Sequence, residues 1–233
     1  MISHRHKCIF IHVPKTAGKT ILHLFGLPMT GKEYDNSLTY IESPYGHTEI
    51  SAYRGHDYFT TYFKFAFVRN PWDRLVSSFF YMSQGGCNHY DAEYAANNLQ
   101  VYQGKFDLFV RNLENHIDHQ HFRPQVFWIR YAGKPRSRDG GSVWKTIKQR
   151  LSFDAPWSGR EGDVSILCDF VGRYETLAAD VQKIAARIGI DGSNLPTLNR
   201  TPHDHYRTYY DTRTASLVAD IYKDDIRAFD YQF

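Results

Sequence analysis

Two short segments of this chain each join a hydrophobic run to a polar turn and then to a helix-like pattern. Residues 10–20 read FIHVPKTAGKT, and residues 65–78 read FAFVRNPWDRLVSS. Where a strand passes into a helix, the unpaired N–H groups of the first turn and the positive end of the helix dipole attract anions. Both segments are therefore expected to hold phosphate-like groups.

The first segment predicts a strand, a turn and a helix. Residues 8–13 are mostly apolar and rich in β-branched and aromatic side chains, which predicts a strand buried on both faces of a parallel sheet. Pro14 ends this strand, and apolar residues recur at helical spacing from Gly18 onward. The turn between them lies at a helix N-terminus, and Lys15 adds a mobile positive charge.

The second segment carries the residues of a well-formed helix start. Residues 64–68 predict a strand, after which Asn70 is a good N-cap residue and Pro71 fits the first helical position. Asp73 completes a start that resembles a capping box. An apolar stripe then follows, made of Trp72, Leu75, Val76, Phe79 and Phe80.

Arg69 stands at the predicted strand end, and Ser77 follows two turns into the helix. A guanidinium group binds phosphate through two parallel hydrogen bonds, and a hydroxyl group adds a further donor. This pair therefore favours a second phosphate site. The structural alternative is an ion pair between Arg69 and Asp73, with Ser77 as an ordinary helix serine.

The ending Gly18-Lys19-Thr20 resembles the end of an ATP-binding P-loop, but Val13 stands where that pattern needs its first glycine. The turn is more similar to the Pro-Lys-Thr-(Ala/Gly)-Gly-Thr-Ser turn of sulfotransferases that use 3′-phosphoadenosine-5′-phosphosulfate (PAPS). In that family the turn holds the 5′-phosphosulfate, and an arginine and a serine placed like Arg69 and Ser77 hold the 3′-phosphate. Lys19 departs from the usual threonine, so its contact with the cofactor stays open.

The resemblance implies a set of cofactor-binding residues. Lys15 is also expected to be catalytic, because it would stabilise the leaving phosphate. Arg200, in a loop after the penultimate helix, is expected near the 3′-phosphate or the adenine. The cofactor-binding set is Pro14, Lys15, Thr16, Ala17, Gly18, Lys19, Thr20, Arg69, Ser77 and Arg200. Neither the reaction nor its cofactor PAPS, which leaves as 3′-phosphoadenosine-5′-phosphate (PAP), requires a metal.

His56 is the predicted catalytic base. In the glycan-modifying branch of the family, a Gly-His pair shortly before the second strand supplies this base, and Gly55-His56 fits that place. Imidazole suits the role because its ordinary pKa of about 6.5 allows it to accept a hydroxyl proton near neutrality. If His56 is not the base, Asp57, Glu49 or another histidine is the alternative.

Later segments extend the resemblance over nearly the whole chain, to the bacterial branch of the carbohydrate sulfotransferase-like family 2. These landmarks lie at residues 121–125, 169–175, 195–200 and 205–210. Strands that alternate with helices predict an α/β fold with a P-loop-like parallel sheet flanked by helices on both faces. We expect one sulfotransferase domain over residues 1–233, with helices at 177–188 and from about 212 to 229 and a strand at 166–171.

Residues 131–162 form a Gly-rich, basic stretch that is longer than expected between the landmarks. Variable loops over a rigid sheet commonly carry specificity, so this stretch is a candidate acceptor-binding flap. A loop without function is the alternative. The flap would suit an anionic acceptor, and family resemblance favours a carbohydrate hydroxyl as acceptor.

Composition agrees with a single enzyme domain. The chain has 233 residues, 42% hydrophobic and 16% aromatic, which excludes disorder, and its net charge of +3 is too small to argue for nucleic acid. Three cysteines, Cys8, Cys87 and Cys168, fit reduced thiols, and no signal peptide or membrane span is visible. A cytoplasmic bacterial enzyme is therefore expected.

Two other functions remain open at the level of sequence. Gly18-Lys19-Thr20 favours an ATP-dependent kinase, although no persuasive carboxylate for Mg²⁺ follows a predicted strand. A non-catalytic module that binds glycans or nucleotides is the other, although the joint presence of Lys15, His56, Arg69 and Ser77 speaks against it. The histidines at 116, 119, 121, 203 and 205 lack convincing metal-ligand spacing and are read as solvated.

Overall fold

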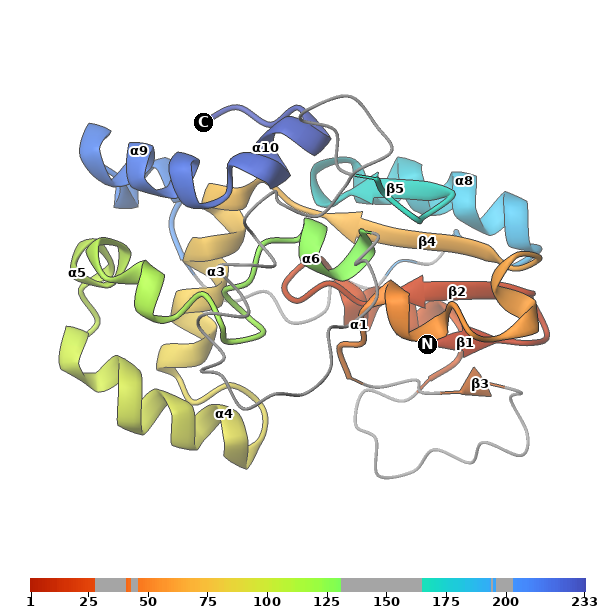
Figure 1. Cartoon of the computed structure of the whole chain (residues 1–233), viewed down its shortest axis with the longest axis horizontal. Helices are drawn as coiled ribbons and strands as arrows, with labels where there is room; N and C mark the ends of the chain where they lie inside the picture. Colours follow the sequence, from red (N-terminus) through yellow and green to blue (C-terminus); the bar gives the residue numbers. More distant parts are fainter. Residues whose placement is uncertain (28–40, 43–45, 131–164, 194, 196–202) are drawn as a thin grey trace.

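A computed structural model describes residues 1–27, 41–42, 46–130, 165–193, 195 and 203–233. Its centre is a sheet of five strands in the order β3-β1-β2-β4-β5 (Figure 1). The strands are β1 (Ile2–Ser3), β2 (Cys8–Ile11), β3 (Ile41–Glu42), β4 (Phe63–Val68) and β5 (Phe170–Arg173). The predicted flap at residues 131–162 and the predicted ligand Arg200 lie outside the described residues.

The sheet is mixed, and only part of it is the parallel sheet that the sequence predicts. β2, β4 and β5 are parallel neighbours, with Phe10 opposite Phe65 and Ala66 opposite Val171. β1 runs antiparallel to both β2 and β3. The prediction of an all-parallel sheet is therefore wrong at this edge, because β1 and β3 have two residues each, too few for a recognisable strand pattern.

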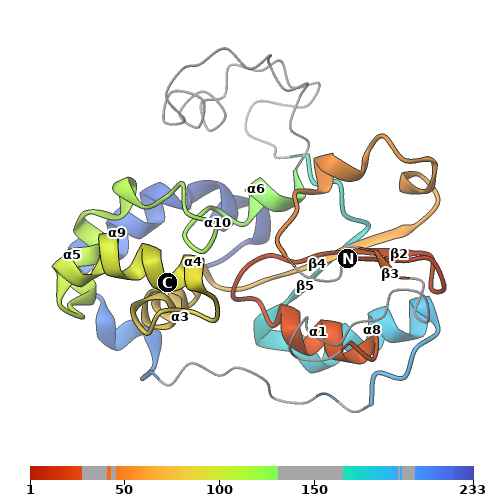
Figure 2. The same cartoon turned by 90° about the horizontal axis from the view of Figure 1, so that it is seen from below.

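Helices cover both faces of the sheet (Figure 2). On one face, α1 (Gly18–Leu24) and α8 (Leu177–Ile188) pack against a cluster that includes Phe10, Phe65 and Phe67. On the other face, α6 (Val126–Ile129) and the chain around Phe229 pack against Ile9 and Ala66. Side chains that alternate along one strand thus enter different cores, which is why these strands read as continuous apolar runs.

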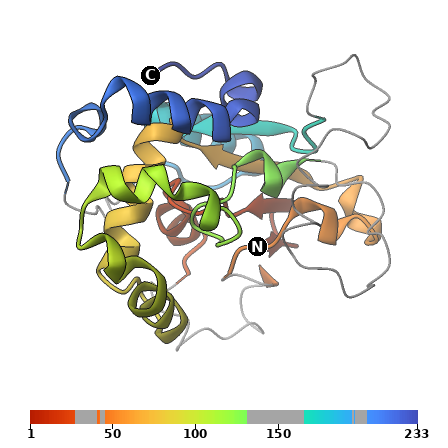
Figure 3. The ribbon, with the colours of Figure 1, turned by 60° about the vertical axis from the view of Figure 1, so that its left-hand side comes forward.

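A third, helical core lies beyond the carboxyl end of β4 (Figure 3). Its main helix is α3 (Pro71–Ser83), whose N-cap Asn70 accepts hydrogen bonds from the backbone N–H groups of Trp72 and Asp73. Around α3 lie α4 (His89–Tyr94), α5 (Phe106–Arg111), α9 (Thr212–Ile221) and α10 (Lys223–Phe229). This core fixes the direction in which α3 leaves the sheet.

Short 3₁₀ or π turns complete the described elements, at Ile50–Tyr53, Asp57–Phe59, Ala95–Leu99, Gln100–Tyr102, Leu113–Asn115, Tyr174–Thr176 and Tyr206–Tyr209. The predicted helix at 177–188 is confirmed. The predicted helix from 212 to 229 is divided at Tyr222, and the predicted strand at 166–171 is displaced to Phe170–Arg173.

Candidate functional site

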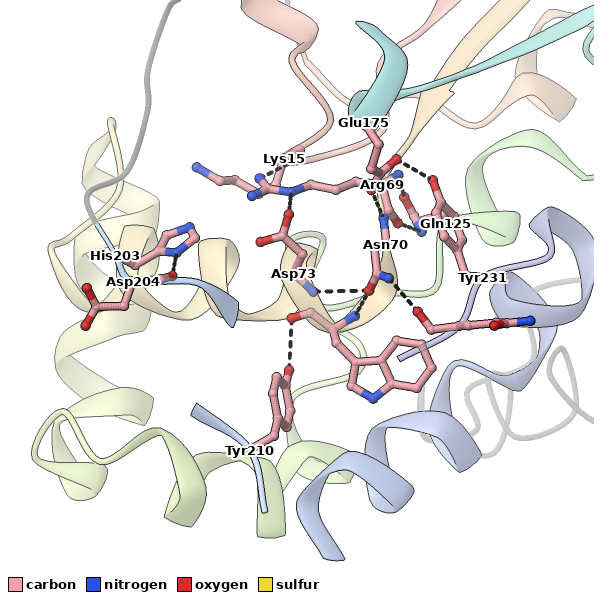
Figure 4. A network of polar contacts seen from close by, with 12 residues as sticks. Lys15, Arg69, Asn70, Asp73, Gln125, Glu175, His203, Asp204, Tyr210 and Tyr231 are labelled. Carbon is pink, nitrogen blue, oxygen red and sulfur yellow. Dashed lines mark hydrogen bonds and ion pairs between the residues drawn. The ribbon is translucent and has the colours of Figure 1, made fainter. Parts of the chain in front are cut away.

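Lys15 and Arg69 follow the carboxyl ends of two neighbouring parallel strands, β2 and β4. The Nη1 atom of Arg69 donates a hydrogen bond to the carbonyl oxygen of Lys15 at 3.5 Å (Figure 4). The carboxyl ends of parallel strands are the usual location of ligands in α/β sheets. The structure therefore brings together the leading residues of the two predicted anion sites.

The turn from Pro14 to Gly18 has an unusual backbone. Lys15 and Ala17 both adopt left-handed φ angles, of 66° and 69°, although neither is a glycine. Such conformations cost roughly 1–3 kcal/mol each and concentrate at functional sites. Left-handed residues in a turn direct successive N–H groups into a concave anion-binding nest. Thr16 braces the turn, because its hydroxyl donates to the carbonyl oxygen of Val13 at 2.9 Å.

Gly18 is required by a close contact at the first residue of α1. A Cβ atom at this position would lie 1.8 Å from Nε2 of His12, which is far inside contact distance. The imidazole ring of His12 therefore lies directly against the turn. Thr20 is buried in the same helix turn, and Lys19 is partly exposed beside it.

The ammonium group of Lys15 lies over the ring of Tyr81, 4.0 Å from its centroid. Burial, with the charges of Arg69 and Lys19 acting in the same direction, lowers the pKa of Lys15 to about 7. An anion at this site would reverse that effect, since a negative charge favours the protonated amine. Binding of an anionic ligand at this site should therefore raise the pKa of Lys15.

The guanidinium group of Arg69 is nearly buried and held from two sides. Its Nε atom donates to Asp73 at 2.8 Å, and the group lies 4.2 Å from the centroid of the Tyr174 ring. The ion pair that was the structural alternative is therefore present. It occupies one of the five N–H donors of the side chain, so it leaves others for a phosphate group. Ser77 is buried farther along α3.

His56 lies at the other end of β4. Its exposed ring stacks on Tyr58 at 4.9 Å, and the ring of Tyr58 lies 5.2 Å from that of Tyr62, the residue before β4. Arg69 follows the carboxyl end of the same strand. The structure thus does not bring His56 together with Lys15 and Arg69, and its role as base stays a prediction.

His47 is a histidine at the site that the sequence analysis did not select. Its Nδ1 atom lies 2.7 Å from the carbonyl oxygen of His12, and the two rings are 4.4 Å apart. Burial lowers the pKa of His47 to about 4. The signal was present in the sequence, because Gly46-His47 is a second Gly-His pair ahead of β4. Gly46 adopts a φ of 105°, which side-chain-bearing residues rarely adopt.

Further polar groups surround the ring of His47. His121 and Trp128 both lie 5.8 Å from it, and among the described atoms Nδ1 of His121 and Nε1 of Trp128 are buried without a hydrogen-bond partner. Unsatisfied buried groups are costly, and they are often explained by function. His116 and His121 are buried, so the prediction that these histidines are solvated is wrong for both. The Nε2 atom of His121 lies 3.6 Å from the carboxylate of Asp91. Asp91 in turn accepts a hydrogen bond from the hydroxyl of Tyr81 at 3.3 Å.

A continuous series of side chains thus lies between the ammonium group of Lys15 and the imidazole of His47. It runs through Tyr81, Asp91 and His121. Burial lowers the pKa of His12, His119 and His121 as well as that of His47, so these rings are neutral at pH 7.

In the described part of the chain, no group of three or more His, Cys, Asp or Glu residues is arranged to hold a metal ion. The described helices include none with the length and apolar character of a membrane span.

Comparison with known proteins identifies a family. The model of a family described as "Sulfotransferase family" matches residues 1–131, which include Lys15, His47 and Arg69. Carbohydrate sulfotransferase 10 from Homo sapiens and from Mus musculus are each 25% identical over 253 residues, covering 98% of this chain. The chain spans 65% of the length of these relatives. No solved structure gave a significant match.

Proposed function

Since the chain belongs to the sulfotransferase family, we propose that it transfers a sulfuryl group from PAPS to a hydroxyl group of a carbohydrate. The observation that supports this best is the contact between the two strand ends, where Arg69 Nη1 meets the carbonyl of Lys15 at 3.5 Å. PAPS carries anionic groups at both its 5′ and its 3′ position. Two adjoining cationic sites, on neighbouring strands, suit such a nucleotide better than one phosphorylated at the 5′ position alone.

The described residues fit the two ends of PAPS. The turn at Pro14 to Gly18, with its two left-handed residues, would offer N–H groups to the 5′-phosphosulfate, and the ammonium of Lys15, which lies over the Tyr81 ring, would add its charge. The guanidinium of Arg69 would take the 3′-phosphate through the donors that Asp73 leaves available. Ser77, Lys19 and Thr20 remain proposed contributors, and so does Arg200 outside the described residues.

We assign the base to His47 in preference to His56. A carbonyl oxygen can only accept, so the Nδ1 atom of His47 must donate to His12, and the proton-free nitrogen is Nε2. In the transfer, the acceptor oxygen forms a bond to sulfur while the bond from sulfur to the 5′-phosphate oxygen breaks. PAP leaves with that electron pair, and the hydroxyl proton passes to Nε2 of His47.

Lys15 would stabilise the charge that develops on the leaving phosphate. Its charge meets the phosphosulfate already in the ground state, so it contributes to both binding and rate. The carbohydrate acceptor rests on the relatives, which are carbohydrate sulfotransferases by name. The unpartnered polar atoms of His121 and Trp128 beside His47 are consistent with an acceptor rich in hydroxyl groups.

A thermal-shift comparison of PAP, ADP and ATP with Mg²⁺ tests the class of ligand. A ligand that binds the native state raises the melting temperature in proportion to the logarithm of its concentration over Kd. We expect PAP to give the largest shift, because only PAP carries a 3′-phosphate for Arg69. A larger shift with ATP and Mg²⁺ than with PAP would favour a kinase and overturn the proposal.

A further inference from the structure

Gln125 holds the backbone of Arg69 through both ends of its side-chain amide. The N–H of Arg69 donates to Oε1 of Gln125 at 2.8 Å, and Nε2 of Gln125 donates to the carbonyl oxygen of Arg69 at 2.8 Å (Figure 4). Arg69 is the first residue after β4, where the ladder of the sheet has ended. The amide of Gln125 thus replaces a neighbouring strand at the residue that carries the guanidinium.

Gln125 is itself held firmly. It is fully buried, and its backbone N–H donates to the carboxylate of Asp225 at 2.8 Å, as does that of Val126. On the opposite side, the guanidinium of Arg74 donates to the carbonyl oxygens of His121 and Arg123, at 3.3 and 2.6 Å. The segment 121–126 is therefore fixed to both α3 and α10.

The next residue is fixed in the same manner. The N–H of Asn70 donates to Oε1 of Glu175 at 2.6 Å, while Tyr231 donates to Oε2 of Glu175 at 3.0 Å. The two peptide groups on either side of the Arg69 Cα are thus both tied by side chains from distant parts of the chain. Because a side chain's direction depends on its backbone, this clamp determines where the Arg69 guanidinium points.

We propose that Gln125 is a positioning residue that orients Arg69 for the 3′-phosphate, and so determines the preference for a 3′-phosphorylated nucleotide. This proposal rests on the proposed function. The 5′ end of the nucleotide would meet Lys15 and the turn at Pro14 to Gly18, which Gln125 does not contact in the described hydrogen bonds. Arg69 itself touches this turn through the bond from Nη1 to the carbonyl oxygen of Lys15, but at 3.5 Å this bond is longer than an ordinary N–H···O bond. Loss of the amide should therefore affect the 3′ end of the ligand much more than the 5′ end.

The test compares Gln125→Met with Tyr222→Phe by calorimetry on PAP and 5′-AMP. Methionine keeps the length of glutamine and removes both hydrogen bonds to Arg69. Tyr222→Phe is the matched control, because its buried hydroxyl donates to the carbonyl of Phe122 in the same segment at 2.6 Å. We expect Gln125→Met to weaken PAP binding about tenfold, the equivalent of one lost charge-assisted hydrogen bond, and 5′-AMP binding less than about twofold.

Tyr222→Phe should lower the melting temperature while the ratio of PAP to 5′-AMP affinity stays at the wild-type value. Equal losses of affinity for both nucleotides in Gln125→Met, or no loss for either, would overturn the positioning role of Gln125. The proposed function would still stand if the wild type prefers PAP to 5′-AMP. A wild type without PAP preference would overturn both. If Gln125→Met does not fold, Gln125→Glu replaces it, since it keeps the acceptor for the Arg69 N–H and places a carboxylate against the Arg69 carbonyl.

A double-mutant cycle gives the second readout. In an Arg69→Ala background the guanidinium is absent, so Gln125→Met should cause no further loss of PAP affinity. Additive losses in the double variant would show that Gln125 acts on PAP by another route and would overturn the proposal.

Discussion

The carbonyl oxygen of His12 lies 2.7 Å from Nδ1 of His47, and this contact determines which nitrogen of His47 can take up a proton. The carbonyl oxygen cannot donate, so the hydrogen must reside on Nδ1 and the lone pair on Nε2. His12 in turn packs against Gly18 at the start of α1. The orientation of the candidate base is thus tied directly to the turn that is proposed to hold the 5′-phosphosulfate.

His47→Ala should lower kcat by roughly 10²–10⁴ while PAP binds with nearly wild-type affinity, because a general base acts on the acceptor proton in the transition state. His56→Ala is the control from the other Gly-His pair and should retain most of the turnover. Steady-state kinetics with a carbohydrate acceptor and calorimetry with PAP measure the two effects. A large loss of kcat in His56→Ala, with little change in His47→Ala, would return the base to His56.

The pH profile gives an independent check on the same assignment. Burial lowers the pKa of His47 to about 4, and a base must be deprotonated to act. The value of kcat/KM for PAPS reports the free enzyme, so it should fall on acidification only near that pKa, well below the ordinary imidazole pKa of about 6.5. An acidic limb near the ordinary value in the wild type would contradict His47 as the base.

Local patterns of sequence were sufficient for the elements on which the site is built. The apolar run before Pro14 and the helix start at Asn70 depend on neighbouring residues, and both were predicted at the right place. The two turns proposed to bind phosphate follow from these elements and from the parallel arrangement of β2 and β4. The proximity of Lys15 and Arg69 is therefore a consequence of local sequence and of the general geometry of parallel strands.

Contacts between distant segments could not be predicted in this way. Two Gly-His pairs precede β4, and spacing along the chain does not show which one folds back to the carboxyl end of the sheet. Nothing local indicates that Gln125 pairs with the Arg69 backbone, or that Glu175 takes the N–H of Asn70 in place of Asp73. Asp73 instead pairs with Arg69, so the capping box is only half formed.

The affinity for PAP should fall as pH rises above about 7. Burial, together with Arg69 and Lys19, lowers the pKa of Lys15 to about 7, so the free protein loses this charge in the neutral range. The ligand's phosphates, with a second pKa near about 6, are already ionised there. An anion binds the protonated amine more tightly, so affinity is full below the free pKa and declines by up to about tenfold per pH unit above it.

Calorimetry between pH 7 and 9 measures this dependence. Lys15→Arg is the control, since a guanidinium keeps its charge through this range and should give an affinity that is nearly independent of pH. A wild-type affinity that stays constant to pH 9 would contradict the role of Lys15 as a titrating contact of the nucleotide.

Gly18→Ala should destabilise the protein and weaken PAP binding together. The new Cβ would lie 1.8 Å from Nε2 of His12, so either the ring or the turn must move. Overpacking of this kind costs typically about 1–3 kcal/mol. Gly55→Ala is the matched control, because no atom lies within 4 Å of the Cβ position there, and its effect should stay within about 0.5 kcal/mol. Urea unfolding measures the stability of both variants. A Gly18→Ala variant as stable as the wild type would contradict the close contact between Gly18 and His12.

Asp225 should make the protein less stable as pH rises through the acidic range. Burial raises the pKa of this carboxyl from 3.8 to about 6, although Arg74 and the N–H groups of Gln125 and Val126 oppose the shift. Because the folded pKa exceeds the unfolded one, loss of the proton costs folding free energy. The contribution of Asp225 to the free energy of unfolding is therefore most favourable below about pH 4. It declines by about 3 kcal/mol in total between about pH 4 and 6, and it is constant above that range.

Urea unfolding of the wild type and Asp225→Asn at several values from pH 4 to pH 7 isolates this contribution. Asparagine cannot titrate, so the variant should gain stability relative to the wild type as pH rises through this window. A lost hydrogen bond would add only a stability difference that does not depend on pH. Asp180→Asn is the control of opposite sign. Burial alone would raise the pKa of Asp180, but the N–H of Arg173 and the ammonium of Lys183 lower it. The Asp180 carboxylate therefore stabilises the fold above its ordinary pKa of 3.8, so Asp180→Asn should be less stable than the wild type by a nearly constant amount from pH 4 to pH 7. Parallel stability curves for Asp225→Asn and the wild type would show that Asp225 does not titrate in this range.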